Sequence, residues 1–384
     1  MSTSRHSEQE LPRWRRAVLK VGSSLLAANG GGLSTRHALG LAEFIASSHR
    51  AGREVVLVSS GAVAAGRALV RAQPEAAHGL AARQALAAIG QTTVVALWQR
   101  FFDRPVAQVL LTHDDLRNRR RYLNARATLR ELLSLGALPV VNENDTVAVD
   151  ELKLGDNDNL AAIVAALVDA DLLLIATDID GLYSANPRSD PAAQAIDDVA
   201  AVTPQVLAMA GGAGSSVGTG GMLTKLEAAT KAATAGIGTV LFNGTDAQAM
   251  RLLAADRLRG TRFRAGETRL HARKYWLRHA PLAGGRIRVD AGAARALQSG
   301  GASLLPGGIV GVSGEFARGD MVEIETMLNE QASSIARGIS QYAAGEVRRI
   351  AGRKSAEIEG LLGYSYGETV VHRDDLVATA GANP

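Results

Sequence analysis

Short apolar runs rich in β-branched residues alternate with longer helical patterns over the first two thirds of the chain. The predicted strands are residues 17–21, 54–58, 106–111, 138–141, 172–176 and 239–242. The predicted helices are residues 33–49, the alanine-rich stretch after Gly61, and residues 120–135, 160–167 and 224–235. Strands that are apolar on both faces and alternate with helices form parallel sheets. We therefore predict the α/β class, with a mostly parallel open sheet sandwiched between helices.

The pattern changes after about Phe263. From Gly284 onward the segments are short, interrupted by glycine and strand-like, which is typical of a compact β-rich module. The predicted strands of this module are residues 286–289, 303–305, 309–312 and 321–324. The predicted organisation is a catalytic domain at 13–263, an Arg-rich linker at 264–282, a small β-rich domain at 283–364 and a C-terminal tail at 365–384.

Composition and charge narrow the class of protein. A chain of 384 residues suits two domains, and its 47% hydrophobic content is enough for a full-sized core. The absence of cysteine excludes a disulfide scaffold, a thiolate metal site and a cysteine nucleophile. We see no secretory signal, and the most apolar run, residues 160–176, contains Asp169 and Asp171. We predict a soluble, cytoplasmic protein without a membrane span.

Two predicted strands are followed by segments suited to anions. The first is Lys20–Ser24, where a buried lysine needs a partner such as phosphate and Gly22 lets backbone amides approach it. A lysine that reaches solvent beside a turn glycine is the alternative. The second is Ser59–Ala62, which opens a helix whose free amides bind carboxylates, unless the serine is an ordinary helix cap. No P-loop motif follows a strand.

Carboxylates and amides gather after two further strands. The runs Asn142–Asp145 and Gly155–Asn159 are too polar for a simple turn, and they lack the glutamate spacing of an EF-hand. They could bind a substrate ammonium or orient nearby lysines. Thr177 and Asp178 follow another strand, where an aspartate can accept a hydrogen bond from a ribose hydroxyl, although a tight turn uses the same residues.

The glycine-rich stretch 211–221 leads into a helix that carries Lys225 in its first turn. Backbone amides of such a loop can surround phosphates. A cation at this end of a helix is unfavourable unless an anion is present. We therefore favour a phosphate site over a plain mobile loop. With Lys20 on a separate element, the set of residues suits phosphoryl transfer without a P-loop.

Taken in order, these motifs resemble the amino acid kinase family over nearly the whole chain. The matching segments are Lys20–Ser24, Val58–Gly66, Asn142–Asp145, Gly155–Asn159, Thr177–Tyr183 and Gly218–Lys225. Residues 303–309 and Gly319-Asp320 resemble the PUA domain that many such kinases carry. The likeness is greatest to members that use ATP to phosphorylate the γ-carboxylate of L-glutamate, the first step of proline synthesis. The sequence departs from the family in extra residues before the first strand, and in Leu223, where we expect a small polar residue.

The resemblance implies a role for particular residues. Lys20 and Lys225 would contact the transferring phosphate, and Asp158 would organise the two lysines. The glutamate ligands would be Ser60, Asp145 and Asn157. The nucleotide ligands would be Lys20, Thr177, Asp178, Thr219, Gly220, Gly221, Met222, Leu223, Thr224 and Lys225.

The resemblance also implies cofactors and partners. ATP would be the co-substrate, and magnesium would take part through ligands that the sequence does not identify. The protein would form a homo-oligomer, a dimer or tetramer, and would be inhibited by proline at or near the glutamate site. Glutamate-5-phosphate reductase, the next enzyme of the pathway, would be a partner.

The chemistry of the reaction agrees with the residues in these motifs. The side chain of glutamate has a reference pKa of ~4.3, so it is ionised at pH 7 and needs no general base. The motifs contain no histidine, and their lysines supply the positive charge that brings two anions together.

Two other functions remain open at this stage. The first is a sister kinase acting on acetylglutamate, aspartate, carbamate or a nucleoside monophosphate, although acetylglutamate has no free ammonium that would require Asp145. The second is an RNA-binding protein, because PUA modules elsewhere bind RNA. Residues 266–384 carry 14 Lys+Arg and 13 Asp+Glu, a balance of only +1, so we do not expect RNA as a partner.

Overall fold

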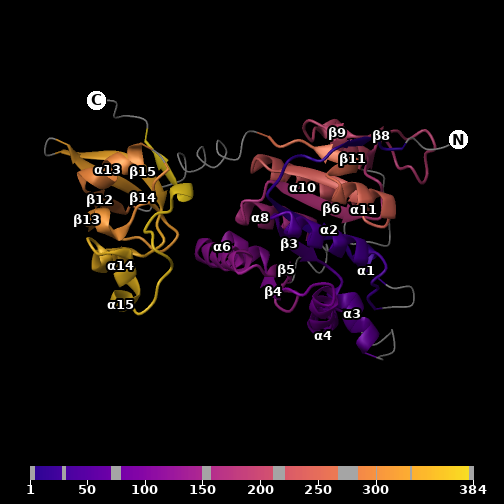
Figure 1. The fold of residues 1–384 in the computed structure, drawn as a ribbon, viewed down its shortest axis with the longest axis horizontal. Coiled ribbons are helices and arrows are strands. Elements are labelled where there is room, and N and C mark those ends of the chain that lie inside the picture. Colours follow the sequence, from indigo (N-terminus) through magenta and orange to yellow (C-terminus); the bar gives the residue numbers. More distant parts are fainter. Residues whose placement is uncertain are drawn as a thin grey trace. The chain divides into compact units, whose positions relative to one another are not determined.

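The structure is a computed structural model that describes residues 5–27, 32–70, 79–148, 157–210, 221–266, 284–299, 301–328 and 331–379. The chain divides into two compact units, Met1–Arg269 and Leu270–Pro384 (Figure 1). We describe each unit by itself. The division falls within the stretch predicted as a linker, and the domain limits given above stay a prediction.

A mostly parallel sheet forms the centre of the first unit, which confirms the predicted fold class. Its strand order is β1-β11-β10-β6-β2-β3-β5-β4, and β9 pairs with β11. The strands from β10 to β4 run parallel to their neighbours, whereas β11 is antiparallel to β10 and β1 is antiparallel to β11. The bounds are β1 Glu8–Glu10, β2 Arg16–Val21, β3 Glu54–Ser59, β4 Val106–Leu111, β5 Leu138–Glu143, β6 Leu172–Thr177, β9 Asp198–Val199, β10 Gly238–Asn243 and β11 Arg257–Phe263. A separate hairpin consists of β7 Leu182–Tyr183 and β8 Ala195–Ile196.

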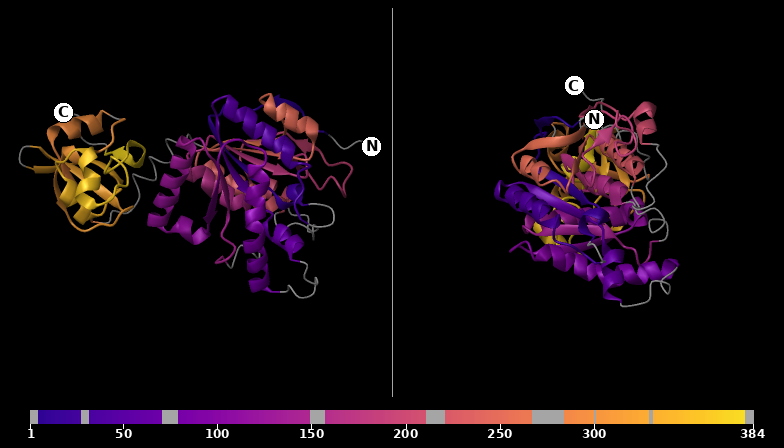
Figure 2. Two further views of the ribbon diagram at one scale, coloured as in Figure 1. Left: turned by 60° about the horizontal axis from the view of Figure 1, so that its bottom comes forward. Right: turned by 90° about the vertical axis from the view of Figure 1, so that its right-hand side faces the viewer.

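Helices cover both faces of this sheet (Figure 2). One face carries α1 Ser23–Leu26, α2 Ala38–Arg50, α3 Ala62–Leu69, α4 Leu80–Gln99 and α11 Ala247–Ala254. The other face carries α5 His113–Arg117, α6 Arg119–Ser134, α8 Asn157–Leu167, α9 Pro204–Met209 and α10 Met222–Thr234. Each layer of helices shares a separate hydrophobic core with the sheet.

The alternation of side chains along β2 decides which core each residue enters. Ala17, Leu19 and Val21 belong to the first core, and Val18 belongs to the second. Since successive side chains of a strand point to opposite faces, Lys20 shares the face of Val18. The lysine therefore lies on the side of the sheet that α8 and α10 cover.

Two predicted helix starts differ from the structure by three residues or more. The helix predicted from residue 33 begins at Ala38, because Leu33 forms an isolated bridge with Ala27 and Gly32 adopts a φ of +85°. The helix predicted from residue 160 begins at Asn157. Asn157, Asp158 and Asn159 are thus buried in a helix rather than part of a loop.

The second unit contains a five-stranded sheet in the order β13-β12-β14-β15-β16. Its strands are β12 Arg286–Val289, β13 Ile309–Ser313, β14 Met321–Leu328, β15 Gln331–Ile339 and β16 Leu376–Ala378. It also has helices that the β-rich prediction missed: α13 Ala291–Gln298, α14 Ala344–Ile350 and α15 Ile358–Leu362. Strand β16 pairs with β15, so residues 376–378, within the segment predicted as a C-terminal tail, belong to this sheet.

The strand predicted at residues 303–305 is wrong. Only Leu304 makes a bridge, to Val371, and the chain then enters a 3₁₀ turn at Pro306–Gly308. Proline at the start of that turn fixes φ near the helical value and removes an amide donor, so the strand cannot continue.

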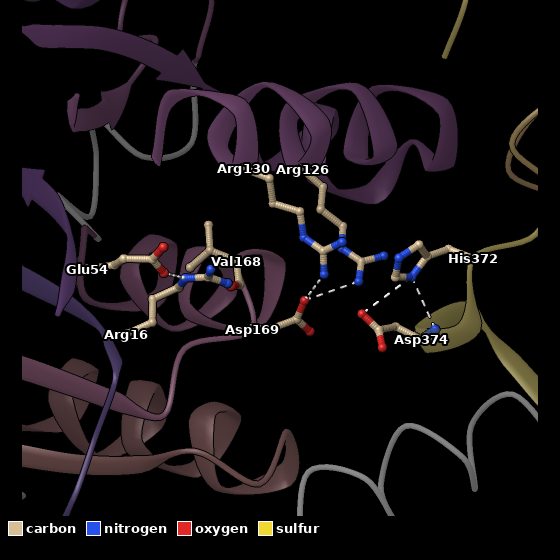
Figure 3. A network of polar contacts seen from close by, with 8 residues as sticks. All are labelled: Arg16, Glu54, Arg126, Arg130, Val168, Asp169, His372 and Asp374. Carbon is tan, nitrogen blue, oxygen red and sulfur yellow. Dashed lines mark hydrogen bonds and ion pairs between the residues drawn. The ribbon is translucent and has the colours of Figure 1, made fainter. Parts of the chain in front are cut away.

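Ion pairs hold the edge of the first unit where the strands begin (Figure 3). Arg16 Nε binds Glu54 Oε2 at 2.6 Å and so joins the starts of β2 and β3. On α6, Arg126 and Arg130 both bind Asp169, which follows α8. These contacts fix the loops at the opposite end of the strands from the polar motifs.

Helix α4 is long and apolar, with one buried face and one exposed face. By length and composition it is the one helix among the described residues that could cross a membrane. Val94, Leu97 and Trp98 on its inner face pack into the first core. Its outer face includes the exposed Ile89.

Glycine lets α3 and α4 cross at very short distance. A Cβ atom on Gly90 would lie 1.9 Å from the carbonyl oxygen of Ala62, and one on Gly66 would lie 1.9 Å from that of Leu86. These atoms belong to helical backbone, which cannot rotate away as a side chain can.

Gly90→Ala should therefore destabilise the first unit by about 3 kcal/mol or more, because the added methyl group forces the two helices apart. Urea unfolding of the variant measures this loss. Gly345→Ala, at an exposed helical glycine with no atom within 4 Å of the new Cβ, is the control and should lose no stability. Equal stability of the two variants would contradict the close crossing.

Candidate active site

The carboxyl ends of the parallel strands meet at one edge of the sheet, where the polar motifs also lie. The chain leaves β2 toward β3 and leaves β6 toward β10, so the direction of winding reverses between the neighbouring strands β2 and β6. In open α/β sheets this reversal opens the crevice in which ligands bind. Lys20 is the last residue but one of β2 and lies at this point.

One buried carboxylate joins the two lysines predicted from the sequence. Lys20 Nζ lies 2.5 Å from Asp158 Oδ1, and Lys225 Nζ lies 3.1 Å from Asp158 Oδ2. All three residues are buried: the exposed fraction is 5% for Lys20, 6% for Lys225 and 1% for Asp158. They come from the end of β2 and from the first turns of α8 and α10. The predicted convergence of the two ammonium groups is therefore present in the fold.

The pKa values show how strongly these charges act on one another. Burial by itself raises the pKa of Asp158, but Lys20, Lys225 and a hydrogen bond from Thr224 outweigh it and hold that pKa at about 2. Burial lowers the pKa of Lys225, and Lys20 acts in the same direction while Asp158 opposes it. One carboxylate faces two ammonium groups, so the cluster can accept a further anion.

The start of α10 offers backbone amides beside this cluster. Gly221 is the N-cap residue and makes no side-chain cap, so the first amides of the helix lack that partner. Thr224 Oγ1 lies 2.8 Å from Asp158 Oδ2. Met222 begins the helix, and Leu223 is 49% exposed. Uncapped amides next to buried ammonium groups form a site suited to phosphate.

Thr219 and Gly220, predicted as nucleotide ligands, lie outside the described residues. Their predicted role stays a prediction.

A second chain of polar contacts runs behind the cluster. Asn157 Nδ2 donates to Ser60 Oγ at 2.6 Å and to Asn142 Oδ1 at 2.9 Å. Asn142 Nδ2 in turn donates to Gln91 Oε1 at 2.8 Å. Since Asp158 follows Asn157 directly, α8 presents one residue to the lysines and the next to Ser60. Two of the predicted substrate ligands, Ser60 and Asn157, are thus in contact.

The sequence predicted no individual role for Asn142, although it lies in the candidate run 142–145, and it did not single out Gln91. Both are buried: Asn142 is 2% exposed and Gln91 is 6% exposed. One sequence feature could have identified them, a polar residue within an otherwise apolar element. Asn142 is such a residue in β5, and Gln91 is one in α4.

Three other predicted residues lie at the same edge of the sheet. Asp145 is half-buried in the turn after β5. Thr177 ends β6 and is buried, whereas Asp178 is exposed and forms an ion pair with Arg188 at 3.5 Å. The charge of Asp178 raises the pKa of Lys225, which shows that it acts on the lysine cluster.

The described residues contain no group of three or more His, Asp or Glu side chains that could hold a metal ion. Asp158, the buried carboxylate of the site, is already bound by two lysines. Magnesium is commonly held by substrate phosphates, waters and one or two carboxylates rather than by a protein cage.

Comparisons with known proteins agree with this arrangement. The sequence pattern of the amino acid kinase family matches residues 15–243, and that of the PUA domain matches residues 285–362. A protein named "Glutamate 5-kinase" from Xanthomonas oryzae pv. oryzae is 71% identical over 360 residues, which are 94% of this chain and 99% of that protein. Another of this name from Xylella fastidiosa is 67% identical over 375 residues, 97% of this chain and 98% of that protein.

Among solved structures, the UMP kinase from Bacillus anthracis matches with a TM-score of 0.45 and 16% identity, covering 66% of this chain and 97% of its own.

Asp158→Asn should destabilise the first unit by about 3–5 kcal/mol at pH 7, because two buried ammonium groups lose their shared counter-charge. The pKa of Lys225 should fall further in this variant. Lys225 then releases its proton more readily in the folded variant than in the unfolded chain. The loss of unfolding free energy relative to the wild type should therefore shrink as the pH rises toward about 10.4, the ordinary pKa of lysine.

Urea unfolding at several pH values measures both effects. Thr224→Ala removes a hydrogen bond to the same carboxylate but no charge, so it should lose only about 1 kcal/mol and show no such pH dependence. A similar loss in both variants at every pH would contradict the electrostatic account.

Proposed function

Since the chain belongs to the amino acid kinase family, we propose that it transfers the γ-phosphoryl group of ATP to the γ-carboxylate of L-glutamate. The product is L-glutamate 5-phosphate, and the reaction is the first step of proline biosynthesis. The observation that carries the proposal is the buried carboxylate of Asp158 shared by Lys20 and Lys225 at the end of β2. Relatives named glutamate 5-kinase, at 67% and 71% identity over nearly the whole chain, support this acceptor.

The reaction joins two anions, so charge neutralisation is the main requirement. An oxygen of the γ-carboxylate attacks the γ-phosphorus of ATP, an O–P bond forms, and the bond from that phosphorus to the bridging oxygen of ADP breaks. The acceptor is ionised at neutral pH, so no residue has to remove a proton. Lys20 and Lys225 stabilise the charge on the transferred group, as preorganised donors do in phosphoryl transfer.

Asp158 has a positioning role in this scheme. Its pKa of about 2 keeps it ionised at neutral pH, so it holds both ammonium groups before substrate arrives. It accepts no proton and forms no covalent bond. When a phosphate binds, each lysine can share its remaining N–H donors with the anion and keep its contact with Asp158.

We propose that Ser60, Asn157 and Asp145 bind the acceptor. Asn157, which contacts Ser60, directly precedes Asp158 on α8. The contact therefore lies beside the lysine cluster. Asp145, at the same edge, would pair with the ammonium of glutamate. Asn142 and Gln91 fix the orientation of the Asn157 amide from behind.

The nucleotide would bind along β6 and α10. Thr177 ends β6 and Asp178 follows it, at a place where an aspartate can bind ribose. Residues 219–225 precede and begin α10 in the sequence, and there the backbone amides and Lys225 would face the phosphates. Magnesium bound to the nucleotide would neutralise phosphate charge. Its protein ligands among the described residues would be few, since no carboxylate cluster is present there.

We further propose a cytoplasmic enzyme that forms a dimer or tetramer and that proline inhibits at or near the glutamate site. Glutamate-5-phosphate reductase would take up the product. The family resemblance supports these points, and the reactivity of acyl phosphates toward water gives a reason for direct uptake of the product.

Trapping with hydroxylamine tests the reaction. Incubation with ATP, Mg²⁺, glutamate and hydroxylamine should yield a hydroxamate, because hydroxylamine attacks an acyl phosphate. A panel with acetylglutamate, aspartate, carbamate and nucleoside monophosphates, read out by ADP release, separates the sister kinases. Turnover of one of these in place of glutamate would overturn the choice of acceptor.

Lys20→Ala and Lys225→Ala should each lower kcat by two or more orders of magnitude, since one preorganised donor is commonly worth ~3–4 kcal/mol in the transition state. The chain should still fold, because Asp158 keeps one lysine partner in either variant. Hydroxamate formation and circular dichroism measure the two properties. Near-wild-type turnover of either variant would show that the lysine has another role.

Asp145→Ala should mainly raise the KM for glutamate and leave the KM for ATP within about twofold. The expected increase is roughly tenfold or more, the effect of a lost charge-assisted hydrogen bond worth about 1.5–3 kcal/mol. Steady-state kinetics with each substrate varied in turn gives both values. An unchanged KM for glutamate would exclude Asp145 as the partner of its ammonium.

A further inference from the structure

The N-terminal segment forms a strand that the apolar pattern of the sequence did not predict. Residues Glu8–Glu10 make β1, which pairs antiparallel with β11 at the edge of the central sheet. The pairing extends past the strand, since Leu11 N donates to the carbonyl oxygen of Asp256 at 2.9 Å. The segment is therefore attached to the folded unit before the chain enters β2.

Three residues of this segment bind one aspartate of the hairpin region. His6 Nδ1 lies 3.0 Å from Asp197 Oδ1, and the backbone amide of Ser7 donates to the same oxygen at 3.2 Å. The hydroxyl of Ser7 donates to Asp197 Oδ2. Gln9 Nε2 donates to the backbone carbonyls of Asp197 at 2.9 Å and Gly260 at 3.1 Å. These contacts join the N-terminal segment to the chain between β8 and β9.

The ring of His6 also packs against the segment that follows β6. His6 is 5% exposed, and its ring meets that of Tyr183 edge to face with centroids 4.9 Å apart. A Cβ atom on Gly181 would lie 2.6 Å from His6 Nε2, so only glycine fits there. The histidine thus fills the space beneath residues 181–183.

The proposed nucleotide ligands directly precede that segment. Thr177 is the last residue of β6, and Asp178 lies between it and Gly181. Beyond them, Asp180 accepts a hydrogen bond from Asn243 Nδ2 at 2.7 Å, and Leu182 N donates to Thr261 Oγ1 at 2.7 Å. The contacts from β10, β11 and His6 hold the connection from three sides.

We propose that His6 is a positioning residue for the nucleotide, and that the N-terminal segment, residues 5–10, holds residues 178–183 in the conformation that binds ATP. This inference rests on the proposed function for its nucleotide, though not for its acceptor. Without His6, the connection after β6 can adopt more conformations. ATP then has to order this connection when it binds, which weakens its binding. Glutamate, which binds along β3, β5 and α8, should be unaffected.

The test uses the full-length chain with His6→Ala, and titration with a non-hydrolysable ATP analogue and Mg²⁺ by calorimetry. His49→Ala is the matched control, because His49 is a half-buried histidine of the same unit whose Nδ1 has no partner within the described residues. It lies in the last turn of α2, near the start of β3 and away from the nucleotide segment. Thermal unfolding of both variants compares their stability.

His6→Ala should weaken binding of the analogue and raise the KM for ATP by roughly five- to fifty-fold, the size of a typical coupling between sites. The KM for glutamate should stay within about twofold. His49→Ala should keep the wild-type affinity for the analogue even if its unfolding temperature falls equally. His6→Asn, whose amide can still bind Asp197 but lacks the ring, should fall between wild type and His6→Ala.

Wild-type affinity of His6→Ala for the analogue would overturn the inference, as would equal weakening by His49→Ala. The acceptor is decided separately. If the wild-type protein binds the analogue but forms no hydroxamate from glutamate, the proposed acceptor fails, while the comparison of His6→Ala with His49→Ala still decides the role of His6.

Discussion

The site depends on one buried carboxylate that binds two ammonium groups from different elements. Lys20 is carried by a strand and Lys225 by a helix, and Asp158 fixes both at the edge of the sheet. Two buried cations would otherwise repel each other and leave the crevice. Within the buried triad, this one carboxylate faces two ammonium groups. The fold thus provides attraction for an anion before any substrate is present.

The winding of the sheet explains why these residues meet. The reversal between β2 and β6 leaves a crevice, and alternation along β2 turns Lys20 toward the layer that contains α8 and α10. Both helices begin at this edge, so their first turns face the lysine. A one-residue change of register in β2 would move Lys20 to the other core and replace it with an apolar side chain.

The sequence alone predicted the six parallel strands from β10 to β4 and most of the helices, because these strands are apolar runs, but not the arginine-rich β11. It also predicted that Lys20 and Lys225 act at one site, whereas the part of Asp158 came from the family resemblance. It did not predict the contact of Asn142 with Gln91, since that pair depends on how deeply α4 packs against the sheet. It also missed β1, whose residues Glu8–Glu10 are polar and too few to show alternation. Tertiary pairing with β11 stabilises this strand where local propensity does not.

The close crossing of α3 and α4 has a consequence for the choice of acceptor. Gln91 follows Gly90 directly, so the separation of the two helix axes also sets how far the Gln91 amide reaches toward Asn142. Through Asn142 this distance fixes the tilt of the Asn157 side chain, and with it the room left beside Ser60. Under the proposed function, small residues at this helix crossing would therefore influence the room left for the acceptor, although neither glycine is among the proposed acceptor ligands.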